Sequence, residues 1–266
     1  MIYFILNMKR IFEAFSNRKA LIPFIVAGDP SLAATEKLIY DFEAAGADIV
    51  ELGIPFSDPL ADGPVIQAAH QRALKKNVSL KDVFALVKKA RKKTEVPIVF
   101  MLAENLIEKY GRAKLFTDCE KAGVDGIIVP DMPPEEVGKG KRDTGNVVNE
   151  IFLVAPTSDD ERIKRIASAS TGFIYLVSTT GITGKRLKLS GQVEEMVKKI
   201  RKFSNKPIAV GFGISNPAQA KETIKYADGV IVGSAIVDLI AKKQFDQAVK
   251  VVAALRKAID QAGKRE

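Results

Sequence analysis

Eight short apolar runs recur along this chain of 266 residues, and each is followed by a turn and then by an amphipathic stretch. Their starts lie between 22 residues (positions 151 to 173) and 49 residues (positions 48 to 97) apart, a spacing typical of repeated strand–helix units. Because the runs are short and almost entirely apolar, they indicate parallel strands that are covered on both faces. They are Leu21–Val26, Asp48–Leu52, Pro97–Met101, Gly126–Val129, Ile151–Val154, Phe173–Val177, Pro207–Val210 and Gly229–Val232.

Eight such units in about 250 residues favour an α/β fold of the closed (β/α)8 type over a doubly wound open sheet. The apolar start of the chain has Lys9 and Arg10 after it rather than before it, which does not fit a signal peptide. It predicts an extra N-terminal helix, Tyr3–Phe15, across the bottom of the barrel. No linker divides residues 1–266, so we expect one domain. Three glycines within Glu135–Asn149 predict a short or broken helix after the fourth strand.

Composition excludes several classes of protein. A single cysteine and a single histidine rule out a disulfide framework and a cysteine- or histidine-rich metal site, so no metal is expected. The net charge is +9, but the basic clusters end helix-like stretches and no nucleic-acid motif accompanies them. No apolar run reaches the roughly 18 residues of a membrane span. We therefore expect a cytoplasmic protein that binds neither nucleic acid nor membrane.

In a barrel of this type, the loops at the carboxyl ends of the strands build the active site. Gly213, Gly233 and Ser234 follow the last two strands, and Gly184 follows the sixth. Glycine lets backbone amides approach an anion closely, and the free amides that begin a helix attract a phosphate. These positions predict a phosphate site, although glycines also occur where a tight turn is the only requirement.

Two carboxylates lie near the carboxyl end of the second strand, Glu51 within it and Asp62 in the loop after it. Glu51 alternates with Ile49 and should point into the top of the barrel, where burial would raise its pKa and suit it to acid–base chemistry. The alternative for Glu51 is a buried structural ion pair. Asp62 lies in a loop rich in proline and glycine that can fold back over the same opening, although an aspartate before Gly63 can also simply form a turn.

Five further side chains have open interpretations. Tyr175 lies within the sixth strand and either packs there or faces the site. His70 should lie on the helix after Asp62, as a surface or capping residue rather than a ligand. Cys119 lies in a helical stretch and is interpreted as an inert thiol. Lys185 and Arg186 are either solvated loop charges or part of a mobile lid over the phosphate.

Taken together, these segments resemble the tryptophan synthase alpha subunit family. The most specific match is the stretch from Glu51 to Pro64, which reads ELGIPFSDPLADGP. The resemblance covers roughly residues 10 to 260. Its other segments are Pro23–Pro30, Asp125–Asp131, Tyr175–Gly184, Val210–Ser215 and Gly233–Val237.

The resemblance implies a TIM barrel that cleaves indole-3-glycerol phosphate to indole and glyceraldehyde 3-phosphate by a retro-aldol reaction. It implies a carbon–carbon lyase of tryptophan biosynthesis with no cofactor in this chain. A beta subunit that carries pyridoxal phosphate (PLP) receives the indole and makes L-tryptophan, in an alpha2-beta2 heterotetramer. The loops Pro55–Pro59 and Thr179–Leu189 would meet that partner.

The resemblance also assigns roles to single residues. Glu51 would be the catalytic acid and base, Asp62 would bind the indole N–H, and Tyr175 would be an accessory residue. Thr183 would link the gating loop after strand six to Asp62. The phosphate contacts would be Gly184, Gly213, Gly233 and Ser234, and the indole pocket would comprise Phe24, Phe212 and Ala103. At Ala103 the family commonly has an aromatic residue, and Asn105 is followed here by leucine rather than proline.

Two other functions stay open at this point. One is a weakly active module that binds and activates the beta subunit, suggested by Ala103 and by the glycines in Glu135–Asn149. The other is a different phosphate-binding barrel enzyme, such as an indole-glycerol-phosphate synthase or a sugar-phosphate isomerase. That alternative shares the glycines near the last strands but does not explain the stretch from Glu51 to Pro64.

Overall fold

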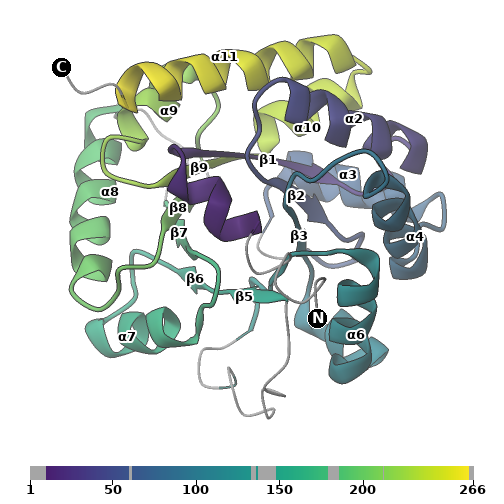
Figure 1. Ribbon diagram of the computed structural model, residues 1–266, viewed down its shortest axis with the longest axis horizontal. Coiled ribbons are helices and arrows are strands. Elements are labelled where there is room, and N and C mark those ends of the chain that lie inside the picture. The colour runs from purple at the N-terminus through teal and green to yellow at the C-terminus, as the bar shows by residue number, and fades with distance from the viewer. Residues whose placement is uncertain are drawn as a thin grey trace.

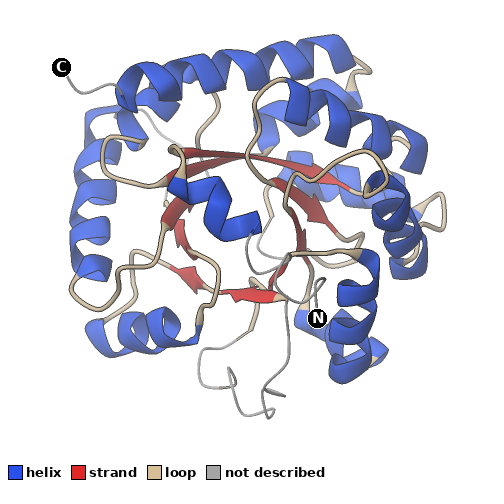
Figure 2. Cartoon of the chain, viewed as in Figure 1, coloured by secondary structure: helices blue, strands red, loops and turns tan. Residues whose placement is uncertain are grey.

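The computed structural model describes residues 10–59, 62–132, 136, 148–178, 186–211 and 213–263. Within them nine parallel strands form a ring with helices around its outside (Figures 1 and 2). Neighbouring strands follow the order β5-β4-β3-β2-β1-β9-β8-β7-β6. The strands are β1 (Ala20–Val26), β2 (Val50–Gly53), β3 (Ile98–Met101), β4 (Gly126–Ile128), β5 (Asn149–Ile151), β6 (Leu153–Val154), β7 (Ile174–Val177), β8 (Ile208–Gly211) and β9 (Gly229–Val232).

The two ends of this order, β5 and β6, are consecutive in the chain and are separated only by Phe152. The predicted strand Ile151–Val154 therefore forms two short strands, of which β5 pairs with β4 and β6 pairs with β7. The carbonyl of Phe152 accepts a hydrogen bond of 3.1 Å from the backbone N–H of Tyr175. The ring closes through Phe152, which confirms the (β/α)8 barrel with its fifth strand in two pieces.

The helices follow the strands in the order expected of strand–helix units. Two helices rather than one follow β2, β3 and β9. Asp159 caps α7 by accepting a hydrogen bond of 2.8 Å from the backbone N–H of Arg162, so the helix begins directly after it. The helices are α2 (Leu32–Ala44), α3 (Pro64–Leu74), α4 (Leu80–Ala90), α5 (Glu104–Tyr110), α6 (Arg112–Ala122), α7 (Asp160–Ala169), α8 (Arg186–Arg201), α9 (Pro217–Thr223), α10 (Ser234–Ala241) and α11 (Phe245–Gly263).

A short helix, residues 10–16, lies across one end of the ring (Figure 1, purple). Its Ile11 is 1% exposed, and the ring of its Phe15 lies 5.4 Å from the ring of Phe173. Arg10 donates a hydrogen bond of 3.1 Å to Asp125, which directly precedes β4. The helix thus covers the amino ends of the strands, as predicted, although positions 3–9 of the predicted helix lie outside the described residues.

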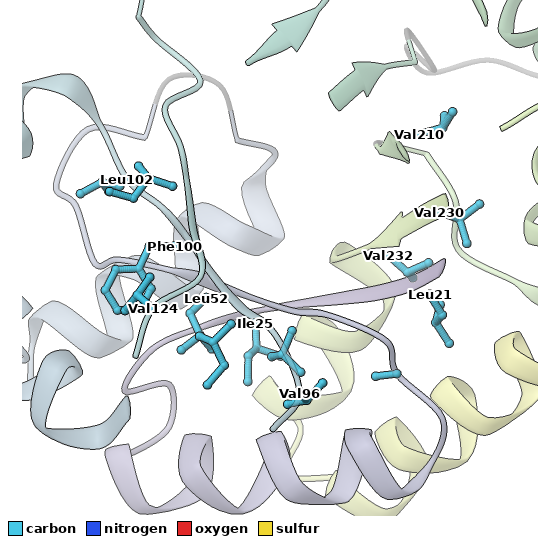
Figure 3. Close-up of a cluster of buried hydrophobic side chains, with 14 of the residues drawn as sticks. Leu21, Ile25, Leu52, Val96, Phe100, Leu102, Val124, Val210, Val230 and Val232 are labelled. Carbon is cyan, nitrogen blue, oxygen red and sulfur yellow. The ribbon is translucent and has the colours of Figure 1, made fainter. Parts of the chain in front are cut away.

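Side chains alternate between the two faces of each strand. On β1, Leu21 and Ile25 face the surrounding helices, while Ile22, Phe24 and Val26 fill the interior of the barrel. Figure 3 shows the outer set, where Leu21 and Ile25 lie with side chains from other strands, Val230 and Val232 of β9 among them. The alternation determines which residue of each strand can reach the inside of the barrel.

Several predicted features lie outside the described residues. They include Thr183, Gly184, Phe212 and all but three positions of Glu135–Asn149. The predicted loop Thr179–Leu189 is shorter than expected, because α8 already begins at Arg186. Of the helices that the structure describes, none combines the length and the apolar character needed to cross a bilayer.

Candidate active site

A cavity of about 560 Å³, counted with its open mouth, lies at the carboxyl ends of the strands. It brings together residues from β1, β2, β3, β7, β9 and α3 with the segments that follow β8 and β9. Its lining consists of Phe24, Glu51, Asp62, Ile66, Met101, Tyr175, Gly213, Ile214, Ser215, Ile231, Gly233 and Ser234.

Glu51 reaches this cavity from β2. It lies in register with Phe24 of β1 on one side and with Val99 of β3 on the other, and all three belong to the inward set. Its side chain is 1% exposed, and neither carboxyl oxygen has a hydrogen-bond partner in the described part of the chain. The predicted alternative, a buried structural ion pair, is therefore wrong within the residues that the structure describes.

The electrostatic consequence of this burial is large. Removal from water, and secondarily the negative charge of Asp62, raise the pKa of Glu51 from 4.5 to about 8. Glu51 is therefore a protonated carboxylic acid at neutral pH. A carboxyl whose pKa lies close to the working pH can both give up and take back a proton.

Asp62 lines the same cavity from the loop after β2. The loop after β2 folds back as expected: the Asp62 backbone N–H donates to the Pro59 carbonyl at 3.0 Å, and Gln67 donates to the Asp62 carbonyl at 2.8 Å. These contacts fix the backbone and leave the carboxylate facing the cavity, with 11% of the side chain exposed. Asp62 is thus more than a turn-forming residue before Gly63.

Tyr175 points inward from β7, beside Ala209 of β8. Burial, followed by the charges of Glu51 and Asp62, raises the pKa of its phenol well above 10. A side chain at Gly211 would overlap the ring, since an ideal Cβ there would lie 2.1 Å from the Tyr175 hydroxyl. Gly211 therefore makes room for the tyrosine, a role that the phosphate interpretation of the neighbouring glycines did not anticipate.

Gly213, Gly233 and Ser234, from the segments after β8 and β9, form a glycine rim of the same cavity. Gly213 has a φ of 78°, in the left-handed region that favours glycine. Gly233 precedes α10 and provides no side-chain cap, so the first N–H groups of this helix, which begins at the cavity with Ser234, have no capping side chain. No lysine or arginine is among the described residues of the lining. An anion at this rim would be held by backbone N–H groups and the helix dipole.

The chain is similar to known proteins of one family. A family model described as tryptophan synthase alpha chain matches residues 12–264. The chain belongs to the tryptophan synthase alpha chain family. The alpha chain of Geotalea daltonii is 49% identical over 88% of this chain and 87% of that protein, and the one from Thermoanaerobacter sp. is 46% identical over 88% and 92%. A crystal structure of the alpha subunit from Legionella pneumophila superimposes with a TM-score of 0.87 at 35% identity, over 95% of this chain and 98% of that one.

Family membership settles the reaction. The tryptophan synthase alpha chain is a lyase that cleaves indole-3-glycerol phosphate to indole and glyceraldehyde 3-phosphate. It has no cofactor of its own, because the PLP of the heterotetramer sits in the beta subunit that receives the indole. A different phosphate-binding barrel enzyme is thereby excluded. Within the described residues no three metal-ligating side chains gather in a cluster.

The structure brings together seven of the residues singled out in the sequence, and they are Phe24, Glu51, Asp62, Tyr175, Gly213, Gly233 and Ser234. Ala103 is not part of this lining. It precedes α5 as its N-cap, and Met101, two residues earlier on β3, faces the cavity instead. The assignment of Ala103 to the indole pocket stays a prediction, and so do the separate roles assigned to Gly184, Phe212 and Thr183.

Cys119 and His70 are both buried, but only Cys119 agrees with its prediction. Cys119 is fully buried in α6 and burial raises the pKa of its thiol, in agreement with an inert side chain. His70 is not on the surface: it is 4% exposed, and its Nε2 lies 3.3 Å from Asp62 Oδ2. Helical spacing contained the signal, because Ile66 and His70 are four residues apart and share one face of α3.

Proposed function

We propose that Glu51 is the acid and base in the retro-aldol cleavage of indole-3-glycerol phosphate by this chain. The observation that carries the proposal is the buried carboxyl of Glu51, with no partner among the described residues and a pKa of about 8, in the same cavity as Asp62. The glycine rim formed by Gly213, Gly233 and Ser234 gives the cavity a second, anion-binding end.

Cleavage needs one proton on indole C3 and the removal of another from the glycerol hydroxyl beside the breaking bond. Protonated Glu51 donates its proton to C3, which leaves a cationic ring and a carboxylate. That carboxylate then takes the hydroxyl proton; the O–H electrons form the aldehyde C=O, and the electrons of the broken C–C bond return to the ring. Indole and glyceraldehyde 3-phosphate leave, and Glu51 is protonated again.

Asp62 supplies the electrostatic part of the mechanism. Its carboxylate accepts the indole N–H and stabilises the positive charge that develops on the ring after C3 is protonated. In a cavity shielded from water this interaction is stronger than in solution. Phe24 and Met101 provide apolar walls for the indole, and Tyr175 packs beside the acids as an accessory residue.

The phosphate binds at the glycine rim through backbone amides and the amino end of α10, with Gly184 as a further contact. The segment Pro55–Pro59, in which Ser57 and Asp58 are exposed, contacts the beta subunit in an alpha2-beta2 assembly. Thr183 links the gating loop, which comes after the sixth predicted strand (β7), to Asp62. The setting is the cytoplasm, in keeping with a chain whose only cysteine is an inert buried thiol.

The test is indole release by purified chain, with and without a beta subunit. Glu51→Gln preserves shape but cannot transfer a proton, and Asp62→Asn removes the carboxylate charge. Both variants should lose about a hundredfold or more in kcat. Wild-type turnover by Glu51→Gln would refute the assigned role, and turnover detectable only with the beta subunit would favour the activating module instead.

A further inference from the structure

His70 is a buried polar side chain that the reaction, as described so far, does not use. It lies on α3 with 5% of its side chain exposed. Its Nδ1 accepts a hydrogen bond of 3.3 Å from the backbone N–H of Phe56. Its other ring nitrogen, Nε2, lies 3.3 Å from Oδ2 of Asp62. The imidazole thus bridges the backbone after β2 and a carboxylate of the cavity.

The first of these contacts defines which nitrogen carries the proton. A ring nitrogen that accepts a hydrogen bond is unprotonated, so the proton of a neutral imidazole lies on the other nitrogen. In His70 that nitrogen is Nε2, which faces Asp62. The Nε2–H group of this neutral ring therefore lies beside one carboxylate oxygen of Asp62, with 3.3 Å between Nε2 and Oδ2.

The surroundings hold the imidazole in place. Gly53, at the end of β2, leaves space that a side chain would fill, since an ideal Cβ there would lie 2.7 Å from Phe24 Cζ and 3.5 Å from His70 Cε1. The helix is fixed two residues further on, where the guanidinium of Arg72 donates two hydrogen bonds, of 2.8 and 2.7 Å, to the buried carboxylate of Asp29. Strand end, helix and backbone together determine where Nε2 lies.

We propose that His70 is a positioning residue that holds the Asp62 carboxylate in the orientation needed to accept the indole N–H. The proposal rests on the role assigned to Asp62 under the proposed function. His70 contacts Oδ2, so in this proposal Oδ1 is the oxygen that accepts the indole N–H. Because Asp62 lies in a loop rather than in a strand or helix, its carboxylate depends on such a contact for a fixed orientation, and misplacement of a group that stabilises the transition state reduces turnover.

A matched pair of substitutions separates the two contacts of the imidazole. Glutamine places an amide near the Nε2 position and can still donate to Asp62, whereas asparagine places its amide near the Nδ1 position and reaches only Phe56. We expect His70→Gln to retain kcat within about threefold and His70→Asn to lose roughly tenfold in kcat, with a smaller change in KM. Equal losses in the two variants, or no loss in His70→Asn, would overturn the proposal.

A double-mutant cycle with Asp62→Asn tests whether His70 acts through Asp62. In the Asp62→Asn background, His70→Asn should change kcat by less than about twofold, since no carboxylate remains to be positioned. A loss as large as in the wild-type background would show that His70 acts by another route. Wild-type turnover by Asp62→Asn itself would instead refute the proposed function, so the two failures are distinguishable. Unfolding midpoints of both His70 variants show whether a loss in kcat reflects the fold.

Discussion

Replacing Glu51 by glutamine should change how the stability of this protein depends on pH. The pKa of Glu51 is about 8 in the folded chain, against 4.5 for a solvated glutamate. Between these two values the folded state holds a proton that the unfolded state has released, so the free energy of unfolding falls as the pH rises. The stabilisation is complete below pH 4.5 and is lost as the pH passes 8. Glutamine has no such proton to lose.

The magnitude follows from the same two numbers. At about 1.4 kcal/mol for each pKa unit, the difference between 4.5 and about 8 corresponds to about 5 kcal/mol, of which about 4 kcal/mol falls between pH 5 and pH 9. Over that interval the wild-type protein should lose about 4 kcal/mol more stability than Glu51→Gln. The figure is an upper bound, because any opening that admits water lets the carboxylate ionise at lower cost.

Urea denaturation of both proteins at pH 5 and pH 9 measures this difference. Groups that titrate in both proteins cancel in the comparison. Asp62→Asn is the matched control: it removes the smaller of the two causes of the high pKa, so the loss between the two pH values should shrink without disappearing. The reasoning fails if wild type and Glu51→Gln lose equal stability between pH 5 and pH 9.

Three further predictions address the rest of the site. The kcat/KM for indole release should fall about tenfold per pH unit above pH 8, because the free enzyme needs protonated Glu51; a constant value up to pH 10 would contradict this. Gly211→Ala should destabilise the fold by about 1–3 kcal/mol and lower turnover, since its Cβ would displace Tyr175, and thermal unfolding measures the effect. Ser234→Asp should raise KM about tenfold or more by repelling the phosphate, while the unfolding midpoint stays nearly unchanged; Ser234→Ala is its control. An unaltered KM in Ser234→Asp would show that the phosphate does not bind at this rim.

Much of the fold could be predicted because barrel strands have a strong local signature. The apolar runs and their spacing were sufficient to identify the (β/α)8 barrel, and alternation with Ile49 was sufficient to direct Glu51 inward. The division of the fifth strand at Phe152 could not be predicted, since it depends on which neighbour each half pairs with. Pairing is a tertiary property that four apolar residues do not encode.

The candidate site was predictable where a residue's direction follows from its strand. Glu51 and Tyr175 lie on strands, and the phosphate glycines Gly213 and Gly233 come within two residues of the ends of β8 and β9. The burial of His70 could have been predicted from its helical spacing with Ile66 on α3. Its contact with Asp62 could not, because that contact depends on how the loop after β2 returns over the barrel. The inward position of Met101 could have been predicted from alternation with Val99 along β3.

The central claim is that two acids and a glycine rim act on one substrate in one cavity. A crystal structure with an indole-3-alkyl phosphate, which lacks the glycerol hydroxyls and cannot be cleaved, tests it most directly. The account predicts the phosphate on the amides of Gly213 and Ser234, the indole N–H on Asp62, and indole C3 facing Glu51. A ligand bound with its indole at the glycine rim, or outside the cavity, would contradict it.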